Sequence, residues 1–541
     1  MERDDDDGIG YVRESHYLKS PSLDRQQAIA LLQVPRGEGR EGSISSSVSD
    51  LDVPIYSSEN LTTSSKREPQ GGFNGKLAFA IAAAALGSSF QHGYNTGVLN
   101  NPQNIIEGWI SATMGNRTQE TPHVDSVTLI FSLMTSIFCI GGMVGGVITG
   151  TVADRFGRKG GLLLNNILVI ASVLCQCLSK AASSYEMMIL GRFIIGVNSG
   201  LNAGLAPMYL AEISPMNLRG AVGTVYQLVI TISILIAQIL GLSGILGTEA
   251  LWPTLLAMTI VPAIFQIVTL PFCPESPKYL LLSKGSESQA QKALSWLRGT
   301  PAVQEEMEVM KSEYEAVKLV PKVTMRELVT NSALRIPLII SLTVMVAQQL
   351  SGINAVMFFS SKIFTMTGLD EDQSKFATMA MGGVNVLMTI VSLFLVERAG
   401  RKTLLMVGFA GMAVDTTLLT IGLIFAQQSK AVGILCVIFV LVYVVMFATG
   451  PGSIPWFLVS ELFNQSARPA ATSLAVCINW TANFLVGLAF LPLAELMKSY
   501  VFIIFIVLQC LFLLFIYKKV PETKNKTLEE ISAMFRQQSY Q

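Results

Sequence analysis

The sequence predicts an all-α membrane protein with twelve transmembrane helices in two pseudo-symmetric six-helix bundles, joined by a small cytosolic helical linker. Of its 541 residues, 51% are hydrophobic and only 14% are charged, whereas a soluble domain carries about 25% charged residues. The mean hydropathy is +0.50. The formal net charge is zero, so charge gives no reason to expect a nucleic-acid partner.

The apolar residues gather into twelve segments, each close to the ~20 residues that cross a bilayer as a helix. The segments are 76–97, 127–150, 161–180, 188–211, 221–245, 251–273, 336–361, 376–396, 403–426, 432–459, 470–494 and 500–518. The predicted divisions are a tail (1–75), a first bundle (76–275), a linker (276–335), a second bundle (336–520) and a C-terminal tail (521–541). The linker carries charged stretches of helical character.

The N-terminal tail is acidic at its start and rich in serine further on, which is typical of a disordered segment. Its first residues lack the basic and apolar character of a cleavable signal peptide. The seven cysteines all fall within apolar stretches and have no metal-ligand spacing. We interpret them as buried small residues, and we expect neither a metal nor another cofactor.

Basic residues in the short loops predict the orientation of the helices. They cluster at 155–159, 398–402 and 518–526, and such loops lie on the cytosolic side of a membrane. Twelve spans then place both termini in the cytosol, and we expect a multi-pass protein of the cell membrane. The loop 98–126 becomes extracellular, so Asn116, in Asn-Arg-Thr, is the predicted glycosylation site.

Three motifs of the first half recur in the second at almost one spacing. The pairs are Asp154–Lys159 with Glu397–Lys402, Glu212 and Arg219 with Glu461 and Arg468, and Pro274-Glu275 with Pro521-Glu522. Two homologous halves are typical of a transporter that rocks around a site at their interface.

These motifs place acids and bases at the predicted cytosolic helix ends. We expect them to pair across the two halves as an inner latch, which holds the cytosolic side shut while the other side is open. The predicted latch residues are Arg158, Glu212, Arg219, Glu275, Arg398, Arg401, Glu461, Arg468 and Glu522.

The seventh apolar segment carries three amides, Gln348, Gln349 and Asn354, in a stretch without charge from Ile336 to Ser361. Amides in hydrocarbon are costly unless they find partners. A polar, uncharged stripe suits a neutral polyhydroxylated solute that crosses the membrane. The alternative is that the amides only join neighbouring helices by hydrogen bonds.

The motifs together resemble those of the sugar porters of the major facilitator superfamily, specifically the animal facilitative glucose transporters. The resemblance covers about residues 76–535. The motifs that carry it are Gly-Tyr-Asn-Thr-Gly-Val (93–98), Asp-Arg-Phe-Gly-Arg-Lys (154–159), Pro-Glu-Ser-Pro-Lys-Tyr-Leu-Leu (274–281), Gln-Gln-Leu-Ser-Gly-Ile-Asn-Ala-Val (348–356), Val-Glu-Arg-Ala-Gly-Arg-Lys (396–402), Gly-Pro-Gly-Ser-Ile-Pro-Trp-Phe (450–457) and Val-Pro-Glu-Thr-Lys (520–524).

The resemblance implies a central hexose site formed mostly by the second half. The implied hydrogen-bonding and stacking residues are Gln227, Gln348, Gln349, Asn354, Asn385, Trp456 and Asn483, with Ile230 and Ile234 as apolar walls. The run 450–455 must break its helix beside Trp456, because it contains two prolines and two glycines.

Some positions depart from the family pattern. Ala448 replaces an acid that usually precedes the Gly-Pro-Gly run, and Phe358-Phe359 replaces a frequent Tyr-Tyr pair that we expect to form an outer lid. Met345-Val346-Ala347 resembles the members that also accept fructose.

The resemblance implies uniport of D-glucose, and fructose as a further substrate, by alternating access. Asn95 occupies the position of an aspartate in proton-driven relatives, and an amide cannot cycle a proton. Two titratable residues, His92 and Asp415, lie in other parts of the spans. We interpret His92 as a hydrogen-bonded helix contact and Asp415 as a neutral or internally paired carboxyl. The alternatives are a proton-coupled sugar symporter and a transporter-like sugar sensor.

An enzyme is not expected, because no span holds a nucleophile beside a base. The expected partners are a hexose and the lipid bilayer, with no obligate protein partner.

Overall fold

The computed structural model describes residues 72–539 except 216–217, 465, 525 and 527. Apart from residues 72–75, the predicted N-terminal tail lies outside the described residues. The described part of the chain is helical and contains no strand, which confirms the predicted all-α class.

The first half contains α2 (Gly75–Ala84), the π-helix η3 (Ala85–Ser89), α3 (Phe90–Gly97), α4 (Gln103–Thr118), α5 (Val124–Phe156), α6 (Arg158–Ala181), α7 (Tyr185–Ile213), α8 (Arg219–Leu240), α9 (Trp252–Ala257), α10 (Ile260–Thr269) and η5 (Leu270–Phe272). The linker contains η6 (Tyr279–Ser283), α11 (Glu287–Arg298), α12 (Gln304–Lys318) and α13 (Met325–Thr330).

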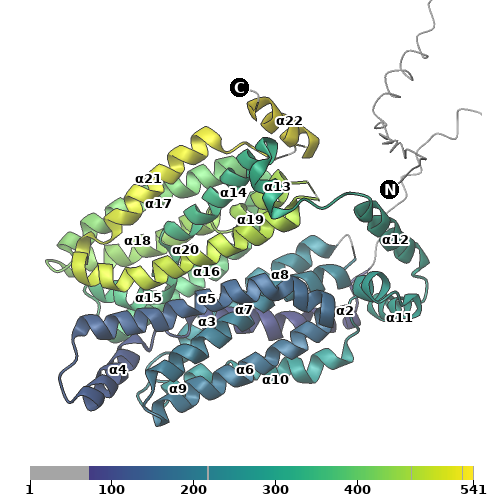
Figure 1. The fold of residues 1–541 in the computed structure, drawn as a ribbon. Coiled ribbons are helices and arrows are strands. Elements are labelled where there is room, and N and C mark those ends of the chain that lie inside the picture. The colour runs from purple at the N-terminus through teal and green to yellow at the C-terminus, as the bar shows by residue number, and fades with distance from the viewer. Residues whose placement is uncertain (1–71, 216–217, 465, 525, 527, 540–541) are drawn as a thin grey trace, which may run out of the picture. The chain divides into compact units, whose positions relative to one another are not determined.

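The second half contains α14 (Ser332–Leu350), α15 (Ile353–Met366), α16 (Glu371–Ala399), α17 (Arg401–Phe425), α18 (Lys430–Thr449), α19 (Ile454–Leu462), α20 (Arg468–Met497), η7 (Lys498–Tyr500) and α21 (Phe502–Lys519), followed by α22 (Leu528–Ser539). The two halves lie side by side in Figure 1.

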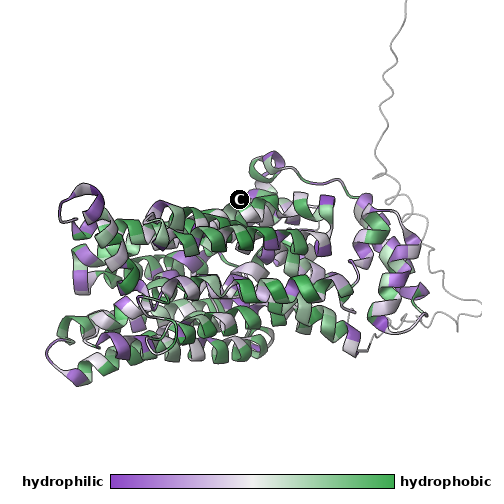
Figure 2. Ribbon diagram, turned by 90° about the horizontal axis from the view of Figure 1, so that it is seen from below, coloured by the Kyte–Doolittle hydropathy of each residue, from purple (hydrophilic) through white to green (hydrophobic). Residues whose placement is uncertain are grey.

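Eleven helical stretches of the described chain are long and apolar enough to cross a membrane. The remaining predicted span, 76–97, is present as the succession of α2, η3 and α3. The π-helical turn has a packing cause: a Cβ on Gly87 would lie 2.5 Å from Gln266 Nε2, and this nitrogen donates to Ser88 Oγ at 2.8 Å. Hydrophobic residues cover the long helices in Figure 2, and hydrophilic residues gather at their ends and in the linker.

Two spans of the second half are broken, of which the sequence predicted only the one at 450–455. Gly352 separates α14 from α15 with φ 99°, a backbone conformation that favours glycine. Residues 450–453 separate α18 from α19, and Pro455 follows at the start of α19. The expected break beside Trp456 is therefore confirmed.

We name the two ends of the bundles by their residues. The loop end carries α4, and the basic end carries Arg158 and Arg401. The halves touch mainly through α5 against α20 and α8 against α16. On α5, a Cβ on Gly142 would lie 2.8 Å from the Trp480 ring, whereas one on Gly150, two turns nearer the basic end, would meet nothing within 4 Å. The halves therefore meet in the middle and at the loop end, and they part toward the basic end.

Helices α5 and α7 pack at backbone distance through glycines. A Cβ on Gly196 would lie 2.3 Å from the Phe138 carbonyl oxygen, and one on Gly141 would lie 2.3 Å from the Phe193 oxygen. Small residues allow such approaches between membrane helices, where apolar burial alone drives little association.

We expect Gly196→Ala to destabilise the first half by at least about 1–3 kcal/mol, because the added methyl group must push two backbones apart. Gly150→Ala is the matched control on α5, with open space around the added carbon. Thermal unfolding of the two purified variants in detergent measures the difference. Equal melting temperatures would contradict the packing argument.

Candidate functional site

Gln348 fastens the break between α18 and α19 to α14. Its Nε2 donates to the carbonyl oxygens of Pro451 and Gly452, both at 2.9 Å. These carbonyls belong to the stretch where helical hydrogen bonding is interrupted, and an unpaired carbonyl in a membrane interior costs several kcal/mol. One predicted binding residue therefore also has a structural role.

The remaining amides of the second half form a network around Gln348. Gln349 Nε2 donates to Asn479 Oδ1 at 3.1 Å, and Asn479 Nδ2 donates to Gln348 Oε1 at 2.9 Å. Asn354 donates to Gln349 Oε1. The structure thus brings together three predicted site residues and adds Asn479, which sequence reasoning missed. Its position one helical turn before Asn483 was an available signal.

Asn483 gives this network an unused hydrogen-bonding group. Its side chain is buried on α20, and its Oδ1 has no hydrogen-bond partner in the described chain. Buried acceptors are normally satisfied. An unpaired amide oxygen beside a set of amides can accept a hydrogen bond from the hydroxyl of a bound molecule.

The other predicted contacts lie on α8, α16 and α19, outside the hydrogen-bonded network. Ile230 and Ile234 are buried on α8, Gln227 is exposed on the same helix, and Asn385 is half-buried on α16. Trp456 lies in the first turn of α19 and is 40% exposed. In the described residues, no hydrogen bond joins Gln227, Asn385 or Trp456 to the amides. The Trp456 indole and the amides of Gln227 and Asn385 are therefore available to a bound molecule.

Phe358 and Phe359 lie on α15 in an aromatic cluster that reaches both halves. Phe359 stacks on Phe490 with ring centroids 5.9 Å apart, and it lies 6.3 Å from Phe131 of the first half. Both phenylalanines of α15 are buried. This position fits the expected lid between the site and the loop end.

Asparagines after α3 join the two halves at the loop end. Asn100 Nδ2 donates to the Met357 carbonyl oxygen at 3.1 Å, and its Oδ1 accepts from the Ser361 amide at 3.0 Å. Ser361 Oγ also donates to Asn101 Oδ1 at 2.9 Å. These hydrogen bonds hold the end of the first span against α15.

A second contact at this end involves a buried cation. Lys375 lies near the start of α16 with a side chain only 3% exposed, and its Nζ donates to Ser243 Oγ of the first half at 2.9 Å. Ser243 in turn donates to Asp372 at 3.1 Å, and Glu371 lies 3.5 Å from the ammonium. We call Ser243, Asp372 and Lys375 the loop-end clasp. Sequence reasoning missed it, although Lys375 directly precedes a predicted span.

Glu107 of α4 adds a carboxyl at the loop end. Burial is the main cause that raises the pKa of Glu107, against the opposing effects of its hydrogen bond from Gln103 and the charge of Lys362. Lys362 itself lies 3.6 Å from Glu495. Protonation of Glu107 therefore costs less here than for a carboxyl in water.

The basic end repeats one arrangement in each half. In the first half, Arg158 pairs with Glu212 at 2.9 Å, and Glu275 accepts from the backbone amides of Arg158 and Lys159 at the start of α6. A carboxylate at a helix N-terminus satisfies free amides and complements the helix dipole.

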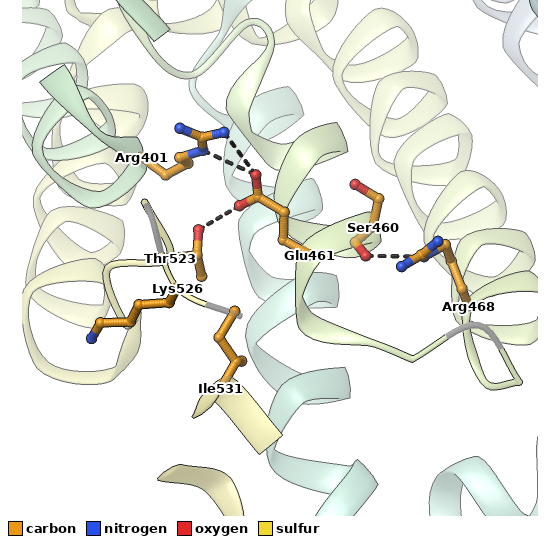
Figure 3. Close-up of a pocket in the computed structure, with 7 residues that line it drawn as sticks. All are labelled: Arg401, Ser460, Glu461, Arg468, Thr523, Lys526 and Ile531. Atoms are coloured by element: carbon orange, nitrogen blue, oxygen red, sulfur yellow. Dashed lines mark hydrogen bonds and ion pairs between the residues drawn. The ribbon is translucent and has the colours of Figure 1, made fainter. Parts of the chain in front are cut away.

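In the second half, Arg401 pairs with Glu461 at 2.9 Å. Glu522 accepts from the backbone amide of Arg401 at 2.9 Å and from that of Lys402 at 3.1 Å. A cavity of about 410 Å³ lies beside this pair, and Figure 3 shows the side chains that line it. Its lining residues are Arg401, Ser460, Glu461, Arg468, Thr523, Lys526 and Ile531.

The expected pairing across the halves is not the one found here. Both ion pairs join residues of a single half, because each carboxylate lies beside the arginine of its own half and the halves part at this end. Arg468 donates to the Ser460 and Phe463 carbonyl oxygens at 3.0 and 3.2 Å, and Arg398 is exposed. The Arg219 side chain lies outside what the structure describes.

Asn95 lies beside a buried cation that sequence reasoning also missed. Arg192 is fully buried on α7 and donates to the Asn95 carbonyl oxygen at 3.0 Å. Its guanidinium lies 4.9 Å from the centre of the Phe138 ring. The Asn95 side chain donates to Thr259 at 2.9 Å. A charged residue within an apolar segment was an available signal.

Two other predicted positions are placed by the structure. Asn116 is exposed near the end of α4. Asp415 is buried on α17, and its Oδ2 has no hydrogen-bond partner among the described residues. Of the two expected forms, a neutral or an internally paired carboxyl, no internal partner is found for this oxygen among the described residues.

The fold of two helical halves, with an amide network in the second, defines a membrane transporter of the major facilitator type. Residues 80–535 match the family described as "Sugar (and other) transporter". The chain belongs to this sugar transporter family, and it is a multi-pass membrane protein.

Relatives with established names support the assignment. The chain is 47% identical over 464 residues to the mouse "Solute carrier family 2, facilitated glucose transporter member 3", which covers 86% of the chain and 94% of the relative. It is 46% identical over 462 residues to member 1 from chicken, which covers 85% and 94%. These relatives are transporters, which supports the expectation that the chain is not an enzyme.

Solved structures of a bacterial xylose transporter share the fold. The inward-open form of XylE from E. coli matches with a TM-score of 0.72 and 24% identity, over 85% of this chain and 99% of that one. The proton:xylose symporter XylE bound to 6-bromo-6-deoxy-D-glucose matches with a TM-score of 0.67 and 26% identity, over 85% and 99%.

The loop-end clasp gives a prediction about conformation. We expect Ser243→Ala to weaken closure at the loop end, because the buried Lys375 ammonium loses a hydrogen-bond acceptor in the other half. Loss of one such bond should shift the open-to-closed ratio at this end by about threefold to tenfold. Labelling of a cysteine placed at Phe359 by a membrane-impermeant thiol reagent measures the opening.

Ser473→Ala is the matched control, because Ser473 is exposed on α20 and, among the described residues, bonds only to the Pro469 carbonyl oxygen. Equal labelling rates in the Ser243 variant and the control would contradict a role of the clasp in closure.

Proposed function

We propose that the chain is a uniporter that carries D-glucose, and also fructose, down its gradient across the cell membrane by alternating access. The observation that carries the proposal is the amide network of α14, α15 and α20, with its unused Asn483 oxygen, in a chain 47% identical to a facilitated glucose transporter. Paired donors and acceptors suit the vicinal hydroxyls of a hexose. Gln349, Asn354 and Asn483 are the contacts that we expect to matter most.

The remaining proposed contacts are Gln227, Gln348, Asn385 and Trp456, with Ile230 and Ile234 as walls. The half-exposed Trp456 indole suits the C–H face of a sugar ring. Phe358 and Phe359 close the site toward the loop end.

The same proposal assigns the sides of the membrane. The basic end faces the cytosol, as do both termini, and exposed Asn116 at the loop end receives the glycan. The acids and bases of the basic end form the inner latch when the halves close there. Each charged residue would then bind a partner in the other half, in place of its present partner or in addition to it. The arrangement described above then corresponds to a carrier open to the cytosol.

Asn95 supports uniport over symport. The buried Arg192 donates to the backbone carbonyl oxygen of Asn95. The side chain at this position is an amide and not a carboxylate, so it cannot load and release a proton. The competing observation is the fold likeness to a proton:xylose symporter, together with the unpaired oxygen of Asp415.

A transport assay in sealed vesicles separates these possibilities. We expect zero-trans glucose uptake by the reconstituted protein to end at equal concentrations on both sides, with or without an acidic exterior. Accumulation above the external concentration under an imposed pH gradient would instead establish symport. Absence of saturable uptake would favour the sugar sensor.

Fructose is tested by competition, because Met345-Val346-Ala347 resembles the fructose-accepting members. We expect excess fructose to inhibit the uptake of labelled glucose by the same vesicles. A lack of inhibition at high fructose would exclude it as a substrate.

The site assignment is tested at Asn483. We expect Asn483→Ala to raise the KM for glucose by about threefold to tenfold, because one hydrogen bond to a hydroxyl is lost. Gln427→Ala, at an exposed position after α17, is the control and should leave KM unchanged. An unaltered KM in the Asn483 variant would remove this residue from the site.

A further inference from the structure

His92 lies on α3, where it meets a helix from each half. Its Nδ1 is 3.0 Å from the Tyr226 hydroxyl of α8, and its ring centre is 6.1 Å from that of Trp480 on α20. The Trp480 ring covers Gly142 of α5 and meets Phe138 edge-on at 6.3 Å. The imidazole is therefore held between the first half and the helix that carries Asn479 and Asn483.

One nitrogen of this imidazole is unused. Nε2 makes no hydrogen bond with any described residue, and it is not among the fully enclosed polar atoms that lack a partner. The His92 side chain is only half-buried. Nε2 is therefore not fully enclosed, and it belongs to a ring that lies between Tyr226 of the first half and the half-buried Trp480 of the second.

The hydrogen bond between Tyr226 and Nδ1 determines whether Nε2 is a donor or an acceptor. A tyrosine hydroxyl that donates to Nδ1 leaves the proton on Nε2, which then donates, and the reverse arrangement makes Nε2 an acceptor. A sugar hydroxyl is satisfied by either form, because it both donates and accepts. A phenylalanine at this position would offer neither.

We propose that His92 Nε2 is a direct hydrogen-bonding contact to one hydroxyl of the transported hexose, supplied by the first half, and that Tyr226 positions it. The inference rests on the proposed hexose transport and extends its site. It gives the first half a polar contact that faces the second half's amides across the bound sugar. A contact confined to joining helices would need only the Nδ1 side of the ring.

The test compares His92→Phe with wild type in reconstituted vesicles, using D-glucose and a series of its monodeoxy analogues as inhibitors of labelled glucose uptake. In wild type, removal of the contacted hydroxyl should weaken inhibition by about threefold to tenfold. In His92→Phe, glucose itself should lose that factor in KM, with kcat little changed. The analogue that lacks the contacted hydroxyl should inhibit His92→Phe as strongly as it inhibits wild type.

Companion variants separate contact from packing. His92→Gln keeps a donor and an acceptor and should recover most of the affinity, whereas Tyr226→Phe should give a smaller loss for the same analogue. His123→Phe, at an exposed position before α5, is the matched control and should leave every inhibition constant unchanged.

Two outcomes would overturn the proposal. Uniform weakening of glucose and all analogues in His92→Phe would assign the residue to packing, and so would unchanged discrimination between analogues. Absence of saturable glucose uptake in wild type would be a failure of the hexose transport proposal itself, and it is seen before any variant is compared.

Discussion

The hydrogen bonds from Gln348 to the Pro451 and Gly452 carbonyl oxygens are the contact on which the site depends. Breaking a helix inside a membrane exposes backbone groups that no water can satisfy. The second half breaks two of its spans in this region, and a side-chain amide of one supplies the missing donors of the other. The break can therefore lie beside the predicted binding residues without an unpaired backbone.

The same amide links the break to the binding network. Gln348 uses its nitrogen on the backbone and its oxygen on Asn479, which in turn accepts from Gln349. When the α18–α19 break moves, these hydrogen bonds must move with it or break. The proposed substrate contacts and the helix geometry are thus coupled by direct contact, as the proposed alternating-access transport requires if binding is to favour a change of conformation.

Sequence reasoning predicted the twelve spans, the break at 450–455 and the three amides of α14 and α15, because each leaves a local mark in hydropathy or residue type. It missed Asn479, Arg192 and the loop-end clasp, since their partners come from helices far apart in the chain. The π-helical turn of Ala85–Ser89 was also unpredictable, because it follows from the packing of Gln266 against Gly87. The expected latch pairing differs because it depends on which end of the halves is closed.

The two ends of the molecule are stabilised by different kinds of contact. At the basic end, Arg158 and Arg401 each pair with a carboxylate of their own half. Glu275 and Glu522 accept from the first amides of α6 and α17, so these charged groups keep their partners while the halves are apart. At the loop end, Lys375 is buried against a serine of the other half, and opening would return its ammonium to water, where a charge is cheapest. Closure there offsets that desolvation with the hydrogen bond to Ser243, the Glu371 carboxylate 3.5 Å away and aromatic packing. The charged end can therefore part without loss of partners, and the loop end stays closed only while its cross-half contacts remain intact.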